Sequence, residues 1–236
     1  AGEPTNTYEK LVLMFDLGNI GNGTDSSTFY FDDIFQTDPT GGLSQIDLPI
    51  TYDDSSVYYS LIPFGDDEGF SEIIFNSNTD NNLVYVTKSS SAATWAGVTV
   101  SNESGFVSNI PVSSSNSNMY VHVYVTGSSN TGIPVRLKIE NNNDPTQSVE
   151  TEAYTTVVDA WEILEFDFNN QATGTAALNE NYPFSMASLF FNFGSAGDDQ
   201  TVYYFDNISF GFISIFFESK SSKFADKNLS VFLILR

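Results

Sequence analysis

The stretch of sequence that decides the fold is GIPVRLKIENNNDPTQSVETEAY, residues 132–154. Apolar and polar residues alternate on both sides of an Asn-rich centre, and this period of two predicts two β-strands joined by a turn at 141–147. Successive side chains of a strand point to opposite faces of the sheet. One face of the pair is therefore expected to face the core, and it comprises Val135, Leu137, Ile139, Val149, Thr151 and Ala153.

The opposite face of the same strand pair is charged. The first strand presents Arg136, Lys138 and Glu140, and the second presents Glu150 and Glu152. Antiparallel pairing about the turn places Lys138 near Glu150 and Arg136 near Glu152. Two of the few bases in the chain are thus expected to lie opposite two acids.

The same alternation recurs along most of the chain, and no convincing amphipathic helix appears. Val, Ile, Phe, Tyr and Thr dominate these runs, and clusters of Asn, Gly, Ser and Asp separate them. Short strands with frequent turns are typical of an antiparallel sandwich. We therefore predict an all-β fold, an antiparallel β-sandwich of the jelly-roll type, with further strands at 120–125, 164–168, 189–193 and 202–210.

The composition excludes several classes of function. The 236 residues include 30 acids and 8 bases, a formal net charge of −22. Because this charge repels nucleic acid and anionic membrane surfaces, we expect neither as a partner. The absence of cysteine excludes disulfides and thiol nucleophiles, and the single histidine, His122, excludes mechanisms that need two. No apolar run approaches the roughly 20 residues of a membrane-spanning helix, so we expect no membrane insertion.

An aromatic pattern occurs twice in the chain, at an offset of roughly 175 residues, about one domain length. LMFDLG at 13–18 and FYFDDI at 29–34 recur in the same order as LFFNFG at 189–194 and YYFDNI at 203–208. The alternative is chance similarity between two aromatic hairpins. A tandem array divides the chain into a C-terminal remnant of an upstream copy (1–36), a linker (37–48), one complete copy (49–210) and an unassigned tail of different composition (211–236).

The complete copy resembles a known family. It opens with PITYDD at 49–54, contains TWAG at 94–97 and AWE at 160–162, and closes with YFDNI at 204–208. These residues are similar to jelly-roll carbohydrate-binding modules of the family four/nine kind. Such modules are found in secreted glycan-degrading enzymes and surface proteins of marine bacteria. The resemblance implies an extracellular or cell-surface location, a polysaccharide partner and covalently linked neighbouring modules.

A polar, aromatic sheet face is the candidate binding site. Flat aromatic rings offer apolar surfaces to sugar rings, and charged side chains bind sugar hydroxyls through hydrogen bonds. The alternative is a solvated sheet face tied by ordinary salt bridges. The net charge favours a neutral polysaccharide, such as a β-glucan. The candidate residues are Trp95, Tyr120, His122, Tyr124, Arg136, Lys138, Glu140, Glu150 and Glu152.

A structural calcium ion is the candidate cofactor. The resemblance implies that the two ends of the copy meet, where such an ion often joins them. This would bring Asp53 and Asp54 of the first strand to Asp206 of the last, and calcium prefers oxygen ligands of this kind. The alternative is that these carboxylates are surface acids or bind backbone groups in turns.

Catalysis finds little support in the sequence. Glu150 and Glu152 share a strand face at a spacing of about 7 Å, within the range that glycosidases use. Both, however, are expected to pair with bases, and the chain has no Gly-x-Ser-x-Gly nucleophile motif. We therefore predict a non-catalytic carbohydrate-binding module. The alternative function is a structural or adhesive, calcium-stabilised repeat that spaces other modules.

Overall fold

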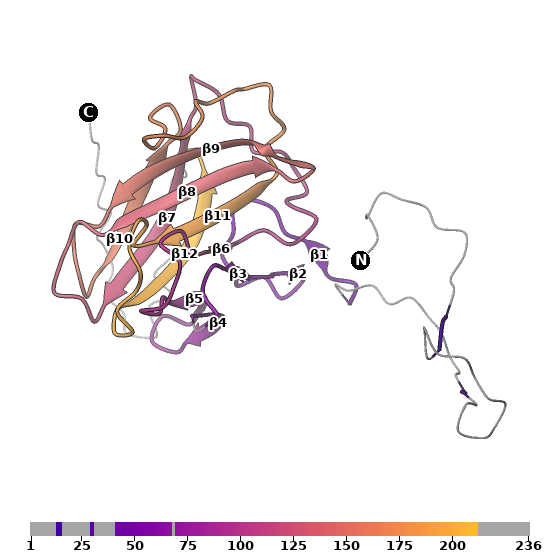
Figure 1. The fold of residues 1–236 in the computed structure, drawn as a ribbon, viewed down its shortest axis with the longest axis horizontal. Coiled ribbons are helices and arrows are strands. Elements are labelled where there is room, and N and C mark those ends of the chain that lie inside the picture. The colour runs from indigo at the N-terminus through magenta and orange to yellow at the C-terminus, as the bar shows by residue number, and fades with distance from the viewer. Residues whose placement is uncertain (1–12, 16–28, 31–40, 68, 212–236) are drawn as a thin grey trace, which may run out of the picture.

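The structure, a computed structural model, describes residues 13–15, 29–30, 41–67 and 69–211 (Figure 1). These residues form an all-β sandwich of two five-stranded antiparallel sheets, with a short parallel pair beside it, and they include no helix. No membrane-crossing helix is therefore found within this part of the chain. The parallel pair is β1 (Ser44–Gln45) and β2 (Val57–Tyr58).

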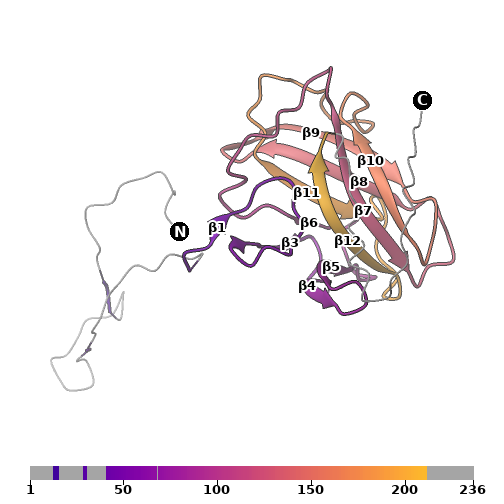
Figure 2. The same cartoon turned by 180° about the vertical axis from the view of Figure 1, so that it is seen from behind.

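We name each sheet after one of its strands. The β7 sheet has the order β10 (Trp161–Asp167), β7 (Asn118–Thr126), β12 (Val202–Phe210), β5 (Asn81–Thr87) and β4 (Phe70–Asn76). The β8 sheet has the order β3 (Ile62–Phe64), β6 (Gly97–Thr99), β11 (Met186–Phe191), β8 (Pro134–Asn141) and β9 (Asp144–Tyr154). The chain passes repeatedly from one sheet to the other, as in a jelly roll, which Figure 2 shows from behind. The predicted fold class is confirmed.

The core lies between the two sheets and is built from the apolar faces that the alternation predicts. Leu137 and Ile139 are fully buried, as the pattern of residues 132–154 requires. Across the core, the ring of Phe191 on β11 stacks on Tyr203 of β12, with centroids 4.8 Å apart and planes inclined by 22°. Aromatic contacts of this kind join the two sheets.

The predicted register of the charged strand pair is confirmed. Arg136 is the partner of Glu152 and Lys138 is the partner of Glu150. The turn is shorter than predicted, because β9 already begins at Asp144 and the pairing shifts at the end of β8.

The packed unit begins upstream of the predicted start at Pro49. Within the predicted linker, Ile46 is fully buried in the core. The side-chain amide of Gln45 donates to the carbonyl of Gly105 at 2.7 Å. Residues 44–48 are therefore part of the sandwich. Most of 1–36 and nearly all of the tail lie outside the described residues, so the predicted remnant and tail stay predictions.

Two described pieces of the N-terminal segment are in contact with each other. The rings of Phe15 and Phe29 stack with centroids 5.1 Å apart and planes inclined by 12°. In the sequence repeat, Phe15 corresponds to Phe191 and Phe29 corresponds to Tyr203. The two equivalent aromatic pairs thus adopt similar stacking.

Candidate functional site

The predicted binding residues lie on two opposite outer faces of the sandwich. Tyr120, His122 and Tyr124 belong to β7, which pairs with β10 and β12. Trp95 and the five charged residues lie on the β8 sheet side instead. The prediction that all of them form one polar face is therefore wrong. Each strand alternates as expected, but the two strands belong to different sheets.

The outer face of the β8 sheet carries an open groove of about 550 Å³. Aromatic side chains line one part of this groove, and charged side chains line the other. Its lining residues are Phe64, Trp95, Thr99, Arg136, Lys138, Glu140, Pro145, Glu150, Thr175, Ser188, Phe190 and Phe193. Five of the predicted residues therefore line it, and Glu152 adjoins it through Arg136.

The groove floor is a row of residues that crosses the sheet. Phe64 pairs with Gly97 on β6, and Phe190 of β11 pairs with Arg136 of β8. A Cβ atom on Gly97 would lie 2.6 Å from the carbonyl oxygen of Leu189 and 2.9 Å from the Phe190 ring. Because Gly97 has no side chain, Phe64 and Phe190 meet edge to face across it, with centroids 5.3 Å apart.

Trp95 flanks this floor and is 54% exposed. Its ring stacks on Phe64 at 6.3 Å with an interplanar angle of 17°. Gly65 lies against the indole, since a Cβ there would come within 2.8 Å of it, and its φ of +75° suits glycine. Trp95 is thus held from below while much of its surface faces solvent.

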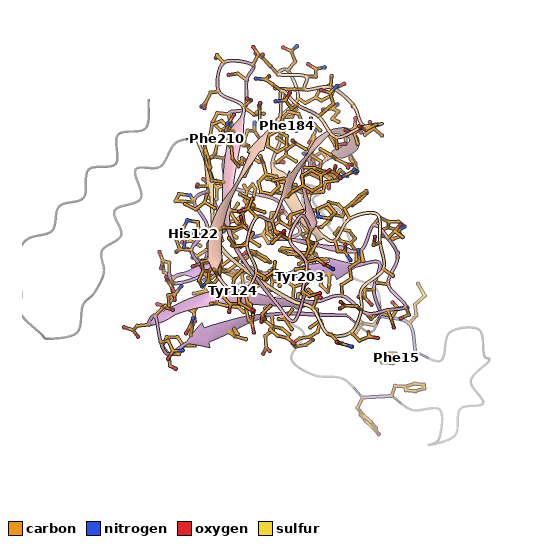
Figure 3. All side chains as sticks on the ribbon, turned by 90° about the vertical axis from the view of Figure 1, so that its left-hand side faces the viewer. Phe15, His122, Tyr124, Phe184, Tyr203 and Phe210 are labelled. Carbon is orange, nitrogen blue, oxygen red and sulfur yellow. The ribbon has the colours of Figure 1, made fainter. Side chains whose placement is uncertain are left out.

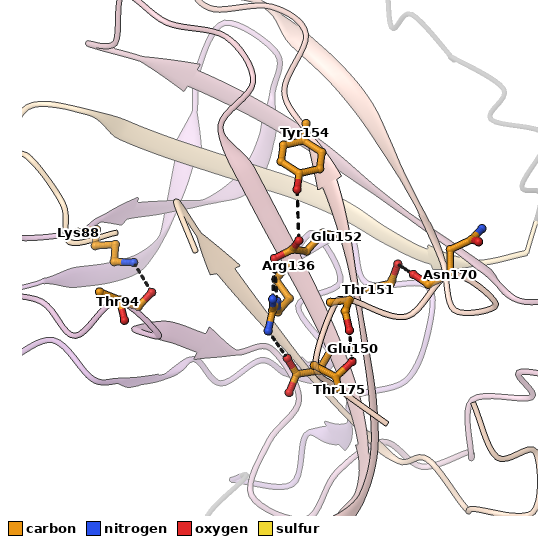
Figure 4. Close-up of polar contacts among 10 residues, drawn as sticks. Lys88, Thr94, Arg136, Glu150, Thr151, Glu152, Tyr154, Asn170 and Thr175 are labelled. Carbon is orange, nitrogen blue, oxygen red and sulfur yellow. Dashed lines mark hydrogen bonds and ion pairs between the residues drawn. The ribbon is translucent and has the colours of Figure 1, made fainter. Parts of the chain in front are cut away.

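Lys88 anchors the loop that carries Trp95. Its buried ammonium donates hydrogen bonds to the carbonyl oxygens of Thr94, Phe191 and Asn192, at 3.2–3.3 Å. Figure 4 shows the bond to Thr94. Burial lowers the pKa of Lys88 to about 8. The ammonium therefore ties the segment before Trp95 to the end of β11.

The charged part of the groove is a network of ion pairs (Figure 4). The guanidinium of Arg136 lies 2.7 Å from Glu150 and 2.7 Å from Glu152. The ammonium of Lys138 lies 2.6 Å from Glu140 on the same strand. Two bases thus face three acids. The network presents hydrogen-bond donors and acceptors with little net charge.

The three predicted residues on β7 have different surroundings, and Figure 3 labels two of them, His122 and Tyr124. Tyr120 donates to Glu165 at 3.4 Å. His122 is half-buried, its Nε2 has no hydrogen-bond partner among the described residues, and burial lowers its pKa. The ring of Tyr124 lies between those of Trp161 and Tyr204. None of the three adjoins the groove.

The predicted calcium ligands do not come together as a set. Asp54 is exposed and accepts hydrogen bonds from the backbone and hydroxyl of Ser56. Asp53 lies close enough to Asp206 for their charges to repel. Within the described ranges, no group of three or more His, Cys, Asp or Glu side chains could hold a metal ion.

Asp206 is occupied by amide donors. Its carboxylate accepts hydrogen bonds from the side chain of Asn81 and from the backbone and side chain of Asn207. Burial, together with the nearby charge of Asp53, raises its pKa to about 7, although the hydrogen bonds from Asn207 and Asn81 act in the opposite direction. Both carboxylate oxygens therefore already accept hydrogen bonds from amide groups.

Sequence reasoning missed the aromatic floor. Phe190 and Phe193 belong to the repeated LFFNFG segment, which we considered only as a repeat signature. Alternation would have placed Phe190 outward, because Leu189 and Phe191 on either side of it face the core. Phe64 lies on a three-residue strand that carries too little periodicity to be recognised.

We found no matching family model and no matching curated protein. Among solved structures, the chain is similar to the CBM22-1 xylan-binding domain of Paenibacillus barcinonensis Xyn10C, at 12% identity and TM-score 0.42, over 70% of this chain and 92% of that one. It is also similar to the family 11 carbohydrate-binding module of Clostridium thermocellum Lic26A-Cel5E, at 11% identity and TM-score 0.44, over 74% and 98%. A third similar structure is the arabinose-bound α-L-arabinofuranosidase MgGH51, at 17% identity and TM-score 0.40, over 71% and 25%. Identities and scores this low transfer no residue's role to this chain.

Proposed function

We propose that this chain is a non-catalytic carbohydrate-binding module that holds a neutral polysaccharide, such as a β-glucan, in the groove of the β8 sheet. One observation carries the proposal. An exposed indole, Trp95, stands over an aromatic floor and beside a network of paired charges in the same open groove. Rings accept the apolar faces of sugars, and the ion-paired side chains offer hydrogen bonds to hydroxyls.

The charges of the groove support a neutral ligand. Arg136 and Lys138 are already neutralised by acids, so the residues that line the groove in the described structure leave no free cation for a sulfate or carboxylate group. The same pairing argues against catalysis, since Arg136 holds both Glu150 and Glu152, the two carboxylates with a glycosidase-like spacing. Neither is free to act as acid or nucleophile.

Affinity electrophoresis tests this function. We expect retardation of the full chain in gels that contain laminarin, xylan, mannan or hydroxyethyl cellulose. Trp95→Ala should weaken the affinity for the retarding glycan by about tenfold without changing the melting temperature. Phe75→Ala is the matched control, because this ring is 61% exposed on β4 and outside the groove. No retardation on any neutral glycan would overturn the proposal.

A structural or adhesive repeat that spaces other modules is the second candidate. It is favoured by the stacking of Phe15 on Phe29, which reproduces the stacking of Phe191 on Tyr203. We infer from this likeness that residues 1–36 derive from an upstream copy in a multimodular, extracellular protein. If Trp95→Ala leaves every glycan affinity unchanged, the spacer function is preferred.

A further inference from the structure

A line of five aromatic rings crosses the outer face of the β7 sheet, on the side of the sandwich opposite the groove. One ring comes from each strand, and neighbouring centroids are 5.6–6.2 Å apart. We call this line the aromatic ladder, and it consists of Trp161 (β10), Tyr124 (β7), Tyr204 (β12), Tyr85 (β5) and Phe70 (β4). With strands about 4.8 Å apart, the ladder is roughly 20 Å long.

The ladder is accessible and fixed in shape. Its two ends are the most exposed, Phe70 at 53% and Trp161 at 43%. Each ring packs against its neighbours in a tilted or edge-to-face contact, with interplanar angles of 52–71°. The strand pairing places Tyr124 directly opposite both Trp161 and Tyr204. A ligand that lies along these rings would lose little of its binding energy to ordering side chains.

Three tyrosine hydroxyls in the middle of the ladder are free. Within the described part of the chain, the hydroxyls of Tyr85, Tyr124 and Tyr204 make no hydrogen bond to another protein group. Their rings lie close together, since the centroid of Tyr204 is 5.6 Å from that of Tyr85 and 5.8 Å from that of Tyr124. By contrast, Tyr120 on the same face is bonded to Glu165. The middle of the ladder thus combines apolar rings with unused donors and acceptors.

The charge of this face limits its ligands. The five strands of the β7 sheet contain no Lys or Arg. Glu72 is the strand partner of Tyr85 in the ladder, and Glu165 lies farther along the sheet, opposite Tyr120. A phosphate, sulfate or carboxylate group would therefore be repelled. A ligand with apolar flat sides and many uncharged hydroxyls matches both the rings and the free tyrosine hydroxyls.

We propose that the aromatic ladder is a second carbohydrate-binding face, which takes a neutral, insoluble polysaccharide. It shares with the proposed function only the chemical class of the ligand, because it uses none of the groove residues. The groove, which is hollow, takes a single chain, and the ladder takes polysaccharide that lies across the five strands.

The test separates the two faces because the chain has only two tryptophans, one on each. In Trp95→Ala, the remaining fluorescence comes from Trp161 on the ladder. Microcrystalline cellulose, insoluble mannan and insoluble xylan are the probes. We expect at least one of them to protect Trp161 of this variant from iodide quenching, measured by front-face fluorescence. If none does, the ladder proposal is overturned.

Depletion binding on the same solids provides a second measurement. The double variant Trp161→Ala/Phe70→Ala should bind the protecting solid about tenfold more weakly than the wild type. Its affinity for the soluble glycan of the groove should not change, and circular dichroism checks its fold. Phe75→Ala is again the control. A double variant that folds and binds the solid as tightly as the wild type overturns the proposal, whatever Trp95→Ala does to soluble glycans.

Discussion

The guanidinium carbon of Arg136 lies 3.5 Å from the centre of the Phe193 ring. The same guanidinium donates to Glu150 and Glu152, so one cation is shared by an aromatic face and two carboxylates. Because the side chain is nearly buried, Arg136 organises the groove as much as it offers hydrogen bonds to a ligand.

We expect Arg136→Ala to lower the free energy of unfolding by about 3 kcal/mol, because it leaves two partly buried carboxylates without a cation. Urea denaturation measures this loss. Lys138→Ala is the control and should cost less, since the Lys138 side chain is 22% exposed against 10% for Arg136 and pairs with one carboxylate instead of two. Equal losses in the two variants would contradict a central role for Arg136. Because Arg136→Ala changes the stability of the fold as well as the groove, Trp95→Ala is the cleaner test of ligand binding.

Lys88→Met should destabilise the loop beneath Trp95. The change removes the donor of three carbonyl oxygens, and leaving such groups unpaired costs about 1–3 kcal/mol. We expect weaker glycan binding as well, because the loop no longer fixes the indole. Urea denaturation and affinity electrophoresis measure the two effects. A Met variant as stable as the wild type would show that these carbonyls need no cation.

The stability contributed by Asp206 should depend on pH. Its folded pKa of about 7 lies above the ordinary value of 3.8, so the folded chain binds this proton more tightly than the unfolded chain. The contribution is therefore complete below 3.8 and is lost as the pH rises through 7. Asp206→Asn removes this titration. The melting temperature of the variant, relative to wild type, should rise between about pH 4 and about pH 7 and then level off. Asp159→Asn is the control, and parallel profiles for all three proteins would contradict the expectation.

Calcium should not stabilise the chain through Asp53, Asp54 and Asp206. Asp54 is directed to Ser56, and amide donors occupy both oxygens of Asp206. We expect the same melting temperature in excess calcium and in EDTA. A rise in calcium that Asp206→Asn abolishes would restore the calcium site predicted from the sequence.

Local patterns predicted the faces of the strands well, and long-range pairing explains what they missed. Alternation alone placed Arg136 and Glu152 side by side, because a short turn fixes the register between their strands. It could not place Tyr124 relative to Arg136, because that depends on which sheet each strand enters. Strand β7 pairs with Trp161–Asp167 and Val202–Phe210, which are far along the chain.

The groove and the aromatic ladder lie back to back on a sandwich only two sheets thick, with the sheets about 10 Å apart. A chain in the groove leaves the ladder uncovered, and a surface against the ladder leaves the groove open. If both proposed faces bind, one copy of this chain would join two polysaccharide strands as a cross-link. It would thicken a suspension of fibres in which a module with one binding face would only coat them.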